Sequence, residues 1–236
     1  MSKALVAQTL ASRVKDGEVI GLGSGSTAEL AIAEMGKRIA REKIRITGVP
    51  TSYRIALLAQ ESGIQVLSPV TAVKLDWAFD GADEIDPSFN MIKGNGAAML
   101  SEKIVARRAK GNFVVIVTEE KFVERLGSKF PVPVEVIPDA LPLVLEGLKA
   151  LGAKDAAPRP SNSKYGPTIS EHNHIVVDAR FENIKPELEL EIKALTGVVD
   201  SGLCVGLVDE VLVSNDKGVI SRRLVNGKFK DEPVKS

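Results

Sequence analysis

Short apolar runs alternate with amphipathic segments over the first half of this 236-residue chain, and this alternation limits the possible folds more than any other feature. Five runs read as strands: VIGL (19–22), IRITGV (44–49), IQVL (64–67), KLDWAFD (74–80) and NFVVIV (112–117). The last run is almost wholly apolar, as expected of a strand buried on both faces. Strands that alternate with helices predict an α/β protein with a Rossmann-like, doubly wound, mainly parallel sheet.

The pattern changes near residue 130, where prolines become frequent. A helix at 139–151 is followed by a polar stretch, 152–167, that we expect to lack regular structure. Strand, helix and strand then follow in the runs HIVVDAR, PELELEIKALTG and VVDSGLCVG, which predicts a smaller ferredoxin-like α+β domain. EVLVSNDKGVIS, at 210–221, reads as a hairpin.

From these changes we expect two domains and a tail. A Rossmann-like catalytic domain takes residues 1–129 and 205–228, and an inserted α+β domain at 130–204 serves oligomerisation. The tail at 229–236 has little to bury and is expected to be frayed.

Composition argues against several classes of partner. The 31 basic residues balance 31 acidic ones, so binding to nucleic acid would need a local basic patch. With one cysteine and two histidines, the chain has few thiolate and imidazole ligands for a metal site. No apolar run reaches the roughly 20 residues that span a bilayer. The first helix has no cleavable apolar segment, so we expect a cytoplasmic protein without membrane or nucleic-acid partners.

The glycine loop GLGSGSTA, at 21–28, lies between a predicted strand and a predicted helix. Backbone amides and the helix dipole favour an anion at such a turn, and Ser24, Ser26 and Thr27 add hydroxyl donors. The loop lacks both the Walker ending and the full dinucleotide spacing. It indicates either a small phosphate site or a tight turn with a serine cap.

Acidic residues crowd the stretch 80–86, DGADEID. Asp80 ends a predicted strand, where open parallel sheets place their ligands, and Asp83 and Glu84 follow. Metal binding is one interpretation, although the EF-hand spacing is absent and Lys93 would compete with a cation. For Asp86, which precedes a proline, we expect a solvated turn.

The lysine loop, residues 93–96, and the helix after it complete the candidate set. Lys93 lies in KGNG, where Asn95 is a possible helix cap. Glu102 has apolar residues at all four helical neighbour positions, namely Ala98, Met99, Val105 and Ala106. Such surroundings favour a raised pKa, as a general base near neutral pH requires. The alternative is a glutamate at the edge of the buried face that reaches to water.

The other candidates are less specific. Lys121 follows a strand and Lys3 lies on the first helix, and either lysine could be solvated or reach a ligand. His172 and His174 lie in a polar loop and are expected to be incidental. Cys204, in an apolar strand, is expected to be buried.

Four blocks together resemble the type A ribose-5-phosphate isomerase family: GLGSGSTA, FDGADEID, KGNGAAMLSEKIVA and KFPVPVEVIP. The resemblance covers nearly the whole chain. It departs at Asn95, where the family more often has glycine, and at TEEK, which leaves the alignment of Lys121 less secure. It implies the reversible conversion of D-ribose 5-phosphate to D-ribulose 5-phosphate, without metal or organic cofactor, in a homodimer or homotetramer.

The resemblance also implies roles for individual residues. Glu102 is the proton-transfer base of a cis-enediolate mechanism, and Asp80, Asp83 and Lys93 line the catalytic site. The chemistry also suits ring opening by Asp80, a sugar hydroxyl held by Asp83, and an oxyanion stabilised by Lys93. The residues expected to bind the sugar phosphate are Ser24, Gly25, Ser26, Thr27, Gly81, Ala82, Gly94, Asn95, Gly96, Lys121 and Lys3.

Two other kinds of protein compete with this interpretation. A non-catalytic sugar-phosphate sensor would carry a helix-turn-helix segment and a basic face, and neither is evident. An acyl-coenzyme A transferase or an aminosugar-phosphate deaminase would be an enzyme of the same broad fold. The DGADE and KGNGAAM blocks favour the pentose isomerase over both.

Overall fold

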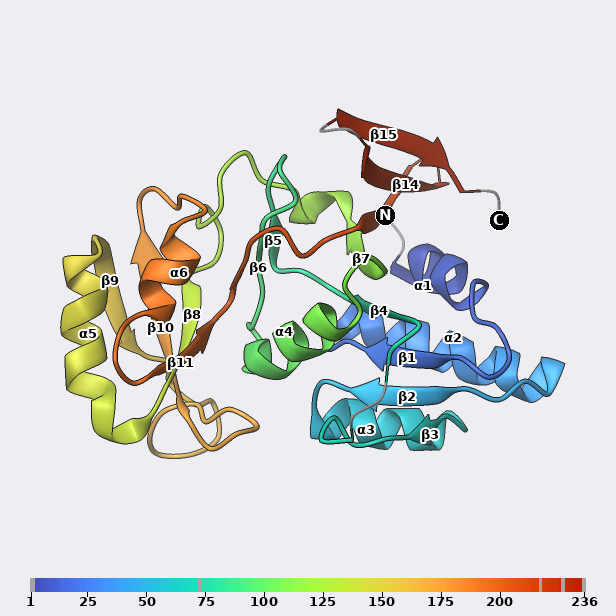
Figure 1. The fold of residues 1–236 in the computed structure, drawn as a ribbon, viewed down its shortest axis with the longest axis horizontal. Coiled ribbons are helices and arrows are strands. Elements are labelled where there is room, and N and C mark those ends of the chain that lie inside the picture. Colours follow the sequence, from blue (N-terminus) through green and yellow to red (C-terminus); the bar gives the residue numbers. More distant parts are fainter. Residues whose placement is uncertain (1–2, 72–73, 217, 226–227, 235–236) are drawn as a thin grey trace. The chain divides into compact units, whose positions relative to one another are not determined.

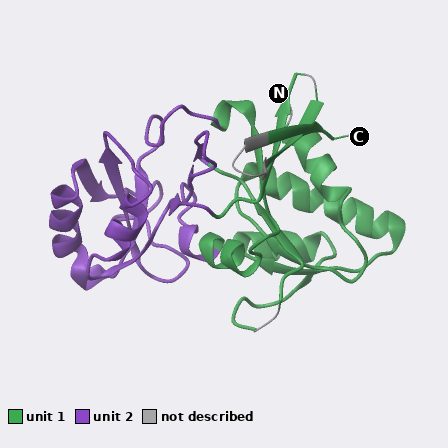
Figure 2. Cartoon of the chain, turned by 45° about the horizontal axis from the view of Figure 1, so that its top comes forward, with its two compact units in different colours: residues 1–82, 102–121, 207–236 green, residues 83–101, 122–206 purple. Residues whose placement is uncertain are grey.

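The computed structural model describes residues 3–71, 74–216, 218–225 and 228–234. Contacts divide the chain into two compact units, coloured separately in Figure 2. Unit 1 comprises residues 1–82, 102–121 and 207–236, and unit 2 comprises residues 83–101 and 122–206. The sequence placed the first change of unit near residue 130, whereas these bounds also assign 83–101 to unit 2.

Unit 1 is built on an eight-stranded sheet in the order β15-β14-β13-β7-β4-β1-β2-β3 (Figure 1). Its strands are β1 (Val19–Leu22), β2 (Thr47–Pro50), β3 (Gln65–Val66), β4 (Trp77–Asp80), β7 (Phe113–Thr118), β13 (Glu210–Asn215), β14 (Gly218–Val225) and β15 (Lys228–Pro233). From β3 to β13 every pairing is parallel, and β14 and β15 add antiparallel strands beyond β13. The predicted Rossmann-like α/β class is confirmed.

The strand order of unit 1 reverses between β1 and β4. From β1 the chain first builds outward through β2 and β3, and then returns to place β4 on the other side of β1. This is the switch point at which doubly wound sheets bind ligands, at the carboxyl ends of the strands. The glycine loop follows β1 and Asp80 ends β4, so both predicted site segments meet this point.

Helices flank the parallel strands of unit 1: α1 (Lys3–Ala11), α2 (Ser26–Glu42), α3 (Tyr53–Glu61) and α4 (Met99–Arg108), with a 3-10 turn η1 (Glu119–Lys121). Helix α2 packs against α1 and α3. Leu10 and Ile32 of these helices join Phe79 and Ile116 of the sheet in one buried core. Among the described residues no helix has the length and apolarity needed to cross a bilayer.

Unit 2 holds a four-stranded antiparallel sheet in the order β11-β8-β10-β9. Its elements are β8 (Val132–Val136), η2 (Pro138–Ala140), α5 (Leu141–Ala150), β9 (Ala153–Pro158), β10 (Ile175–Phe181), α6 (Leu188–Lys193) and β11 (Val198–Ser201). This βαββαβ order with the last strand beside the first is the ferredoxin-like arrangement, as predicted. A second small sheet joins β12 (Leu203–Cys204), β6 (Met91–Ile92) and β5 (Glu84–Ile85).

Two predictions about regular structure were wrong. Residues 153–158 form strand β9 although the stretch was expected to be irregular, because pairing with β10 holds the strand while Lys154, Asp155 and Ala157 stay exposed. The tail was expected to be frayed from residue 229, but β15 pairs with β14 from Val225↔Lys228 to Ile220↔Pro233. The hairpin predicted at 210–221 is confirmed, since Asn215 pairs with Gly218.

Candidate active site

The glycine loop of unit 1 joins β1 to the first turn of α2. Gly25 is the N-cap residue, with φ +101°, and no side chain caps the helix, so the serine-cap interpretation is wrong. The first helical bond runs from the amide of Glu29 to the carbonyl of Gly25. The amides of Ser26 and Thr27 precede that bond and have no intrahelical acceptor, which is the arrangement that favours an anion.

The hydroxyls of this loop differ in what they contact. Ser24 Oγ lies 2.7 Å from Thr51 Oγ1, and Thr51 in turn donates to the carbonyl of Leu22, so the Ser24 hydroxyl is held inside unit 1. Ser26 is exposed, and its Oγ accepts a 2.9 Å hydrogen bond from Lys3 Nζ. The structure therefore brings the predicted ligand Lys3 to the loop.

Asp80 is buried at the carboxyl end of β4, beside the same loop. Its Oδ1 accepts hydrogen bonds from the amides of Ser24, at 3.0 Å, and Gly81, at 2.7 Å. A Cβ on Gly23 would lie 2.4 Å from the Asp80 carboxyl carbon, so only glycine fits there. The predicted phosphate loop and the predicted ring-opening acid are thus joined by hydrogen bonds across the switch point of unit 1.

The lysine loop lies in unit 2 with Asp83. The Asn95 amide donates to Asp83 Oδ2 at 3.0 Å, and the Lys93 amide donates to the carbonyl of Gly202 at 2.9 Å. Lys93 is buried and Gly94 has φ +96°. Asn95 does not cap the following helix, because α4 begins only at Met99. Unit 2 therefore brings together the predicted residues Asp83, Lys93 and 94–96.

Glu102 lies in the first turn of α4, at the point where the chain passes from unit 2 to unit 1. Its side chain is 5% exposed, and its four helical neighbours Ala98, Met99, Val105 and Ala106 are all buried. The alternative of a glutamate reaching to water is therefore wrong. Lys121, the last residue of η1, is half-buried after β7.

The model of the family described as Ribose 5-phosphate isomerase A (phosphoriboisomerase A) matches residues 47–218. A Ribose-5-phosphate isomerase A from Synechococcus sp. (strain WH7803) is 45% identical over 226 residues, 94% of each chain. A relative of the same name from Pyrococcus horikoshii is 41% identical over 92% of this chain and 95% of its own.

Solved structures agree. Ribose 5-phosphate isomerase A from Methanocaldococcus jannaschii superposes with a TM-score of 0.89 at 42% identity, covering 94% of this chain and 97% of that one. A D-ribose-5-phosphate isomerase in complex with phospho-erythronic acid has the same TM-score and coverage at 40% identity. The chain belongs to the ribose 5-phosphate isomerase A family. The family resemblance seen in the sequence is confirmed.

The structural role of Glu84 was not predicted from the sequence. This residue is fully buried in unit 2. Its carboxylate accepts hydrogen bonds from three backbone amides, those of Gly127, Lys129 and Phe130. It therefore anchors the segment that leads into β8. No sequence signal distinguishes Glu84 from its acidic neighbours, because the amides that it binds lie more than forty positions further along the chain.

Both histidines make hydrogen bonds, although sequence analysis treated them as incidental. His172 Nε2 lies 2.9 Å from Ser101 Oγ, and His174 Nδ1 lies 2.8 Å from Glu135 Oε1. Ser170 Oγ donates to the same Glu135 oxygen at 2.7 Å. Ser170 and His174 thus tie the polar loop of unit 2 to a buried carboxylate of β8, and His172 ties it to Ser101 of α4, which are structural roles. Cys204 is buried, as predicted.

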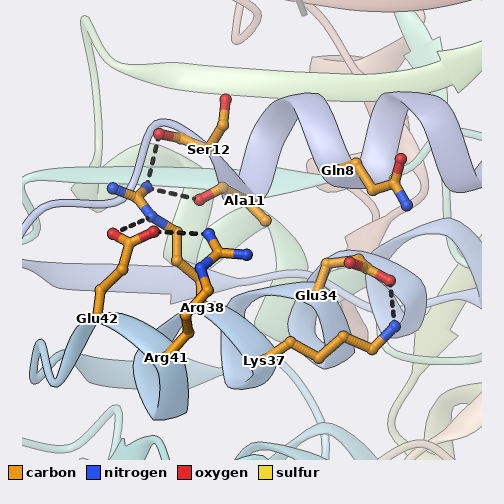
Figure 3. Close-up of a pocket in the computed structure, with 8 residues that line it drawn as sticks. All are labelled: Gln8, Ala11, Ser12, Glu34, Lys37, Arg38, Arg41 and Glu42. Carbon is orange, nitrogen blue, oxygen red and sulfur yellow. Dashed lines mark hydrogen bonds and ion pairs between the residues drawn. The ribbon is translucent and has the colours of Figure 1, made fainter.

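Unit 1 also has a hollow of about 470 Å³ over α1 and α2, shown in Figure 3. Arg38 Nη1 donates to the carbonyls of Ala11 and Ser12, and its Nε donates to Glu42. Lys37 pairs with Glu34. These charged side chains pair with one another, and Arg38 also binds the carbonyls at the carboxyl end of α1. The side chains that line the hollow therefore form a cluster that caps this helix. None of the predicted site residues lines it.

Metal ligands are also sparse. Across the described ranges, no three His, Cys, Asp or Glu side chains gather in the way that a metal ion would require. The acidic stretch 80–86 instead directs its carboxylates to backbone amides, as Asp80 and Glu84 show.

Proposed function

We propose that this isomerase interconverts D-ribose 5-phosphate and D-ribulose 5-phosphate through a cis-enediolate, with Glu102 as the base that moves the proton. The 45% identity to a Ribose-5-phosphate isomerase A over 94% of this chain is the single observation that carries the reaction. A relative solved with phospho-erythronic acid, a phosphorylated sugar acid, supports a sugar phosphate as the ligand class.

The phosphate end of the substrate binds the first turn of α2 in this proposal. Amides of Ser26 and Thr27 precede the helical hydrogen-bond ladder, and the Lys3 ammonium lies beside Ser26. Positive charge and unbonded amides favour a dianion. Binding energy from this remote group orients the reacting carbons.

Proton transfer belongs to Glu102. One carboxylate can remove the proton from C2 and return it to C1, because it reaches both carbons from the same face of the planar cis-enediolate. Burial of Glu102 among apolar side chains shields that carboxylate from water. Lys93 supplies positive charge to the developing oxyanion, and Asp80 opens the sugar ring.

Asp83 has two tasks in this scheme. One of its oxygens, Oδ2, accepts from the Asn95 amide and so orients the lysine loop. The other oxygen holds a sugar hydroxyl. Asp83 follows Asp80 after only two residues, so the chain itself limits the separation of their Cα atoms to about 11 Å.

The test is Glu102→Gln in an assay of ribulose 5-phosphate formation. We expect kcat to fall by about 10²- to 10⁴-fold while KM changes less than about threefold, because the amide binds but cannot accept the proton. Glu191→Gln, an exposed glutamate on α6, is the matched control and should behave as wild type. Near-normal turnover of Glu102→Gln would refute the base assignment.

The same purified protein is used to test the competing functions and the source of the positive charge that stabilises the oxyanion. Wild-type protein should prefer ribose 5-phosphate over aminosugar phosphates and acyl-coenzyme A donors. Activity should survive dialysis against EDTA, because Lys93 supplies the positive charge. Activity that is lost with EDTA and restored by a divalent cation would favour a metal-assisted mechanism instead.

Self-association through unit 2, giving a homodimer or homotetramer, is part of the proposal. Leu143 of α5 and Leu190 of α6 are exposed, as apolar contacts between copies would require. Light scattering coupled to size exclusion should give a mass two or four times that of the chain. A monomer at micromolar concentration would contradict this proposal.

A further inference from the structure

We propose that Arg159, fixed by Asp178, is a positioning residue that sets the geometry of the lysine loop for the isomerase reaction. The inference rests on the proposed function, in which Lys93 and its loop stabilise the oxyanion. All residues involved lie in unit 2.

The guanidinium of Arg159 divides its donors between a carboxylate and the loop. Nε and Nη2 donate to Oδ2 and Oδ1 of Asp178 at 2.9 and 2.7 Å. Nη1 donates to the carbonyls of Gly94 and Asn95, both at 2.9 Å. The side chains of Arg159 and Asp178 are only 13% and 27% exposed. A planar fork that is locked on one edge by a carboxylate presents its other edge in a fixed direction.

The backbone of Arg159 is fixed as well. Its amide donates to the carbonyl of Val176 at 2.8 Å, and its carbonyl accepts from the amide of Thr168 at 2.7 Å. Asp178 is on β10, which pairs with β8 and β9 in the centre of the four-stranded sheet. The guanidinium is therefore held by a central strand of the four-stranded sheet.

One peptide group of the loop is held from both ends. The Gly94 carbonyl accepts from Arg159, and the Asn95 amide, which belongs to the same peptide group, donates to Asp83. A trans peptide points these two groups in opposite directions, so a cation and an anion together fix its orientation. The orientation of the peptide group between Gly94 and Asn95, one residue after Lys93, is therefore fixed.

The next peptide group is fixed through its oxygen. The Asn95 carbonyl accepts from the same Nη1 atom, so the Gly96 amide of that peptide group must point away from Arg159. Because the carbonyls of Gly94 and Asn95 both point towards Arg159, the amides of Asn95 and Gly96 both point to the opposite side, as in an anion-binding nest. One of these amides serves Asp83, and we assign the Gly96 amide as a second oxyanion donor beside Lys93.

The loop conformation requires such support. Gly94 and Ala97 have φ of +96° and +62°, and the Ala97 value is costly for a residue with a Cβ. The Ala97 amide donates to the Gly94 carbonyl, so the hydrogen bond that closes this turn uses the same carbonyl that Arg159 binds. Because Asn95 is exposed, water can replace the guanidinium at this turn, and we expect the fold to survive its loss.

The experiment compares Arg159→Met, Arg159→Lys and Asp178→Asn in the full chain. We expect kcat to fall about 10- to 100-fold in Arg159→Met with KM within about threefold, because the loop donors are misplaced for the transition state. Arg159→Lys keeps the charge but cannot serve a carboxylate and two carbonyls together, so it should restore only part of the activity. Asp178→Asn should show a smaller loss of kcat than Arg159→Met.

Arg180→Met is the matched control. Arg180 lies on β10 two positions from Asp178, on the same face of the strand, and it is exposed. Among the described residues no hydrogen bond joins it to the lysine loop. Its kcat should equal that of wild type within about twofold.

Hydrogen exchange over residues 93–98, together with thermal unfolding, separates positioning from a general structural role. Faster exchange confined to this segment, with Tm nearly unchanged, is expected for Arg159→Met. A kcat within twofold of wild type, or a loss that only follows the unfolded fraction, would overturn the inference. If wild-type protein does not isomerise ribose 5-phosphate, the proposed function fails. Exchange that stays at the wild-type rate in Arg159→Met would then refute the support of the loop by Arg159.

Discussion

At the scale of single residues, four neighbouring acids have four different environments. Asp80 is held by the amides of Ser24 and Gly81, Asp83 by that of Asn95, and Glu84 by three amides of a distant segment. Asp86 accepts from the amides of Ser88 and Asn90, so it closes the turn predicted there. The sequence shows that acids cluster, but the amides that distinguish them are supplied by the fold.

Glu84→Gln should destabilise the protein by about 3 kcal/mol, because an amide replaces a carboxylate that accepts three buried hydrogen bonds. Urea denaturation of wild type and variant gives the difference. Glu182→Gln is the control, since Glu182 is exposed and its ion pair with Lys154 is screened by solvent, so this variant should unfold at the same urea concentration as wild type. Equal stability of Glu84→Gln and wild type would show that the three amides find other acceptors.

At the scale of elements, the sequence predicted best those segments whose own periodicity reveals them. The apolar run 112–117 and the turn after β1 were recognised because burial on both faces and a glycine turn leave local patterns. Strands β9 and β15 were missed because they are held by pairing with β10 and β14, which no local pattern shows. Likewise the Asn95 position looked anomalous, yet its backbone lies outside the left-handed region, so glycine is not required there.

The junction of α1, β13 and β14 depends on one carboxylate, Glu210. Burial alone would raise the pKa of Glu210, but hydrogen bonds from Arg13, Ser221 and Arg223, together with the charge of Arg13, lower its pKa to about 2. Its side chain is only 5% exposed. Because the folded pKa is depressed below the usual 4.5, this stabilisation is complete above pH 4.5 and is lost as pH falls towards 2.

Glu210→Gln should therefore lower the free energy of unfolding by about 3 kcal/mol at pH 7, and the difference from wild type should shrink towards zero near pH 2. Urea denaturation at a series of pH values measures both quantities. Glu187→Gln, exposed at the start of α6, should remain within about 0.5 kcal/mol of wild type at every pH. A difference that does not vary with pH would mean that Glu210 acts through packing instead of charge.

At the scale of the whole molecule, each unit has its own core, and the chain passes from one unit to the other at 82/83, 101/102, 121/122 and 206/207. The sequence indicated the second domain from its change of composition near residue 130, but not the contribution of residues 83–101. That segment continues directly from β4, and its strands β5 and β6 have only two residues each. Strands this short leave no periodicity to detect.

These bounds make a prediction about autonomous folding. Residues 122–206 contain the whole four-stranded sheet, α5 and α6, and every buried member of the apolar cluster around that sheet except Ile92. Alone, this fragment loses the Glu84 acceptor for three amides and the pairing of Leu203 with Ile92. We expect cooperative thermal unfolding, followed by circular dichroism, at a lower Tm than that of the full chain.

The fragment carrying Val134→Asp is the control for that experiment. Val134 is fully buried in β8, so an unpaired carboxylate there should abolish the cooperative transition. A broad transition in the unsubstituted fragment would mean that residues 83–101 are needed for the core of unit 2 to form. In that case Glu84, the buried carboxylate that joins the two segments of unit 2, would be required for folding as well as for stability.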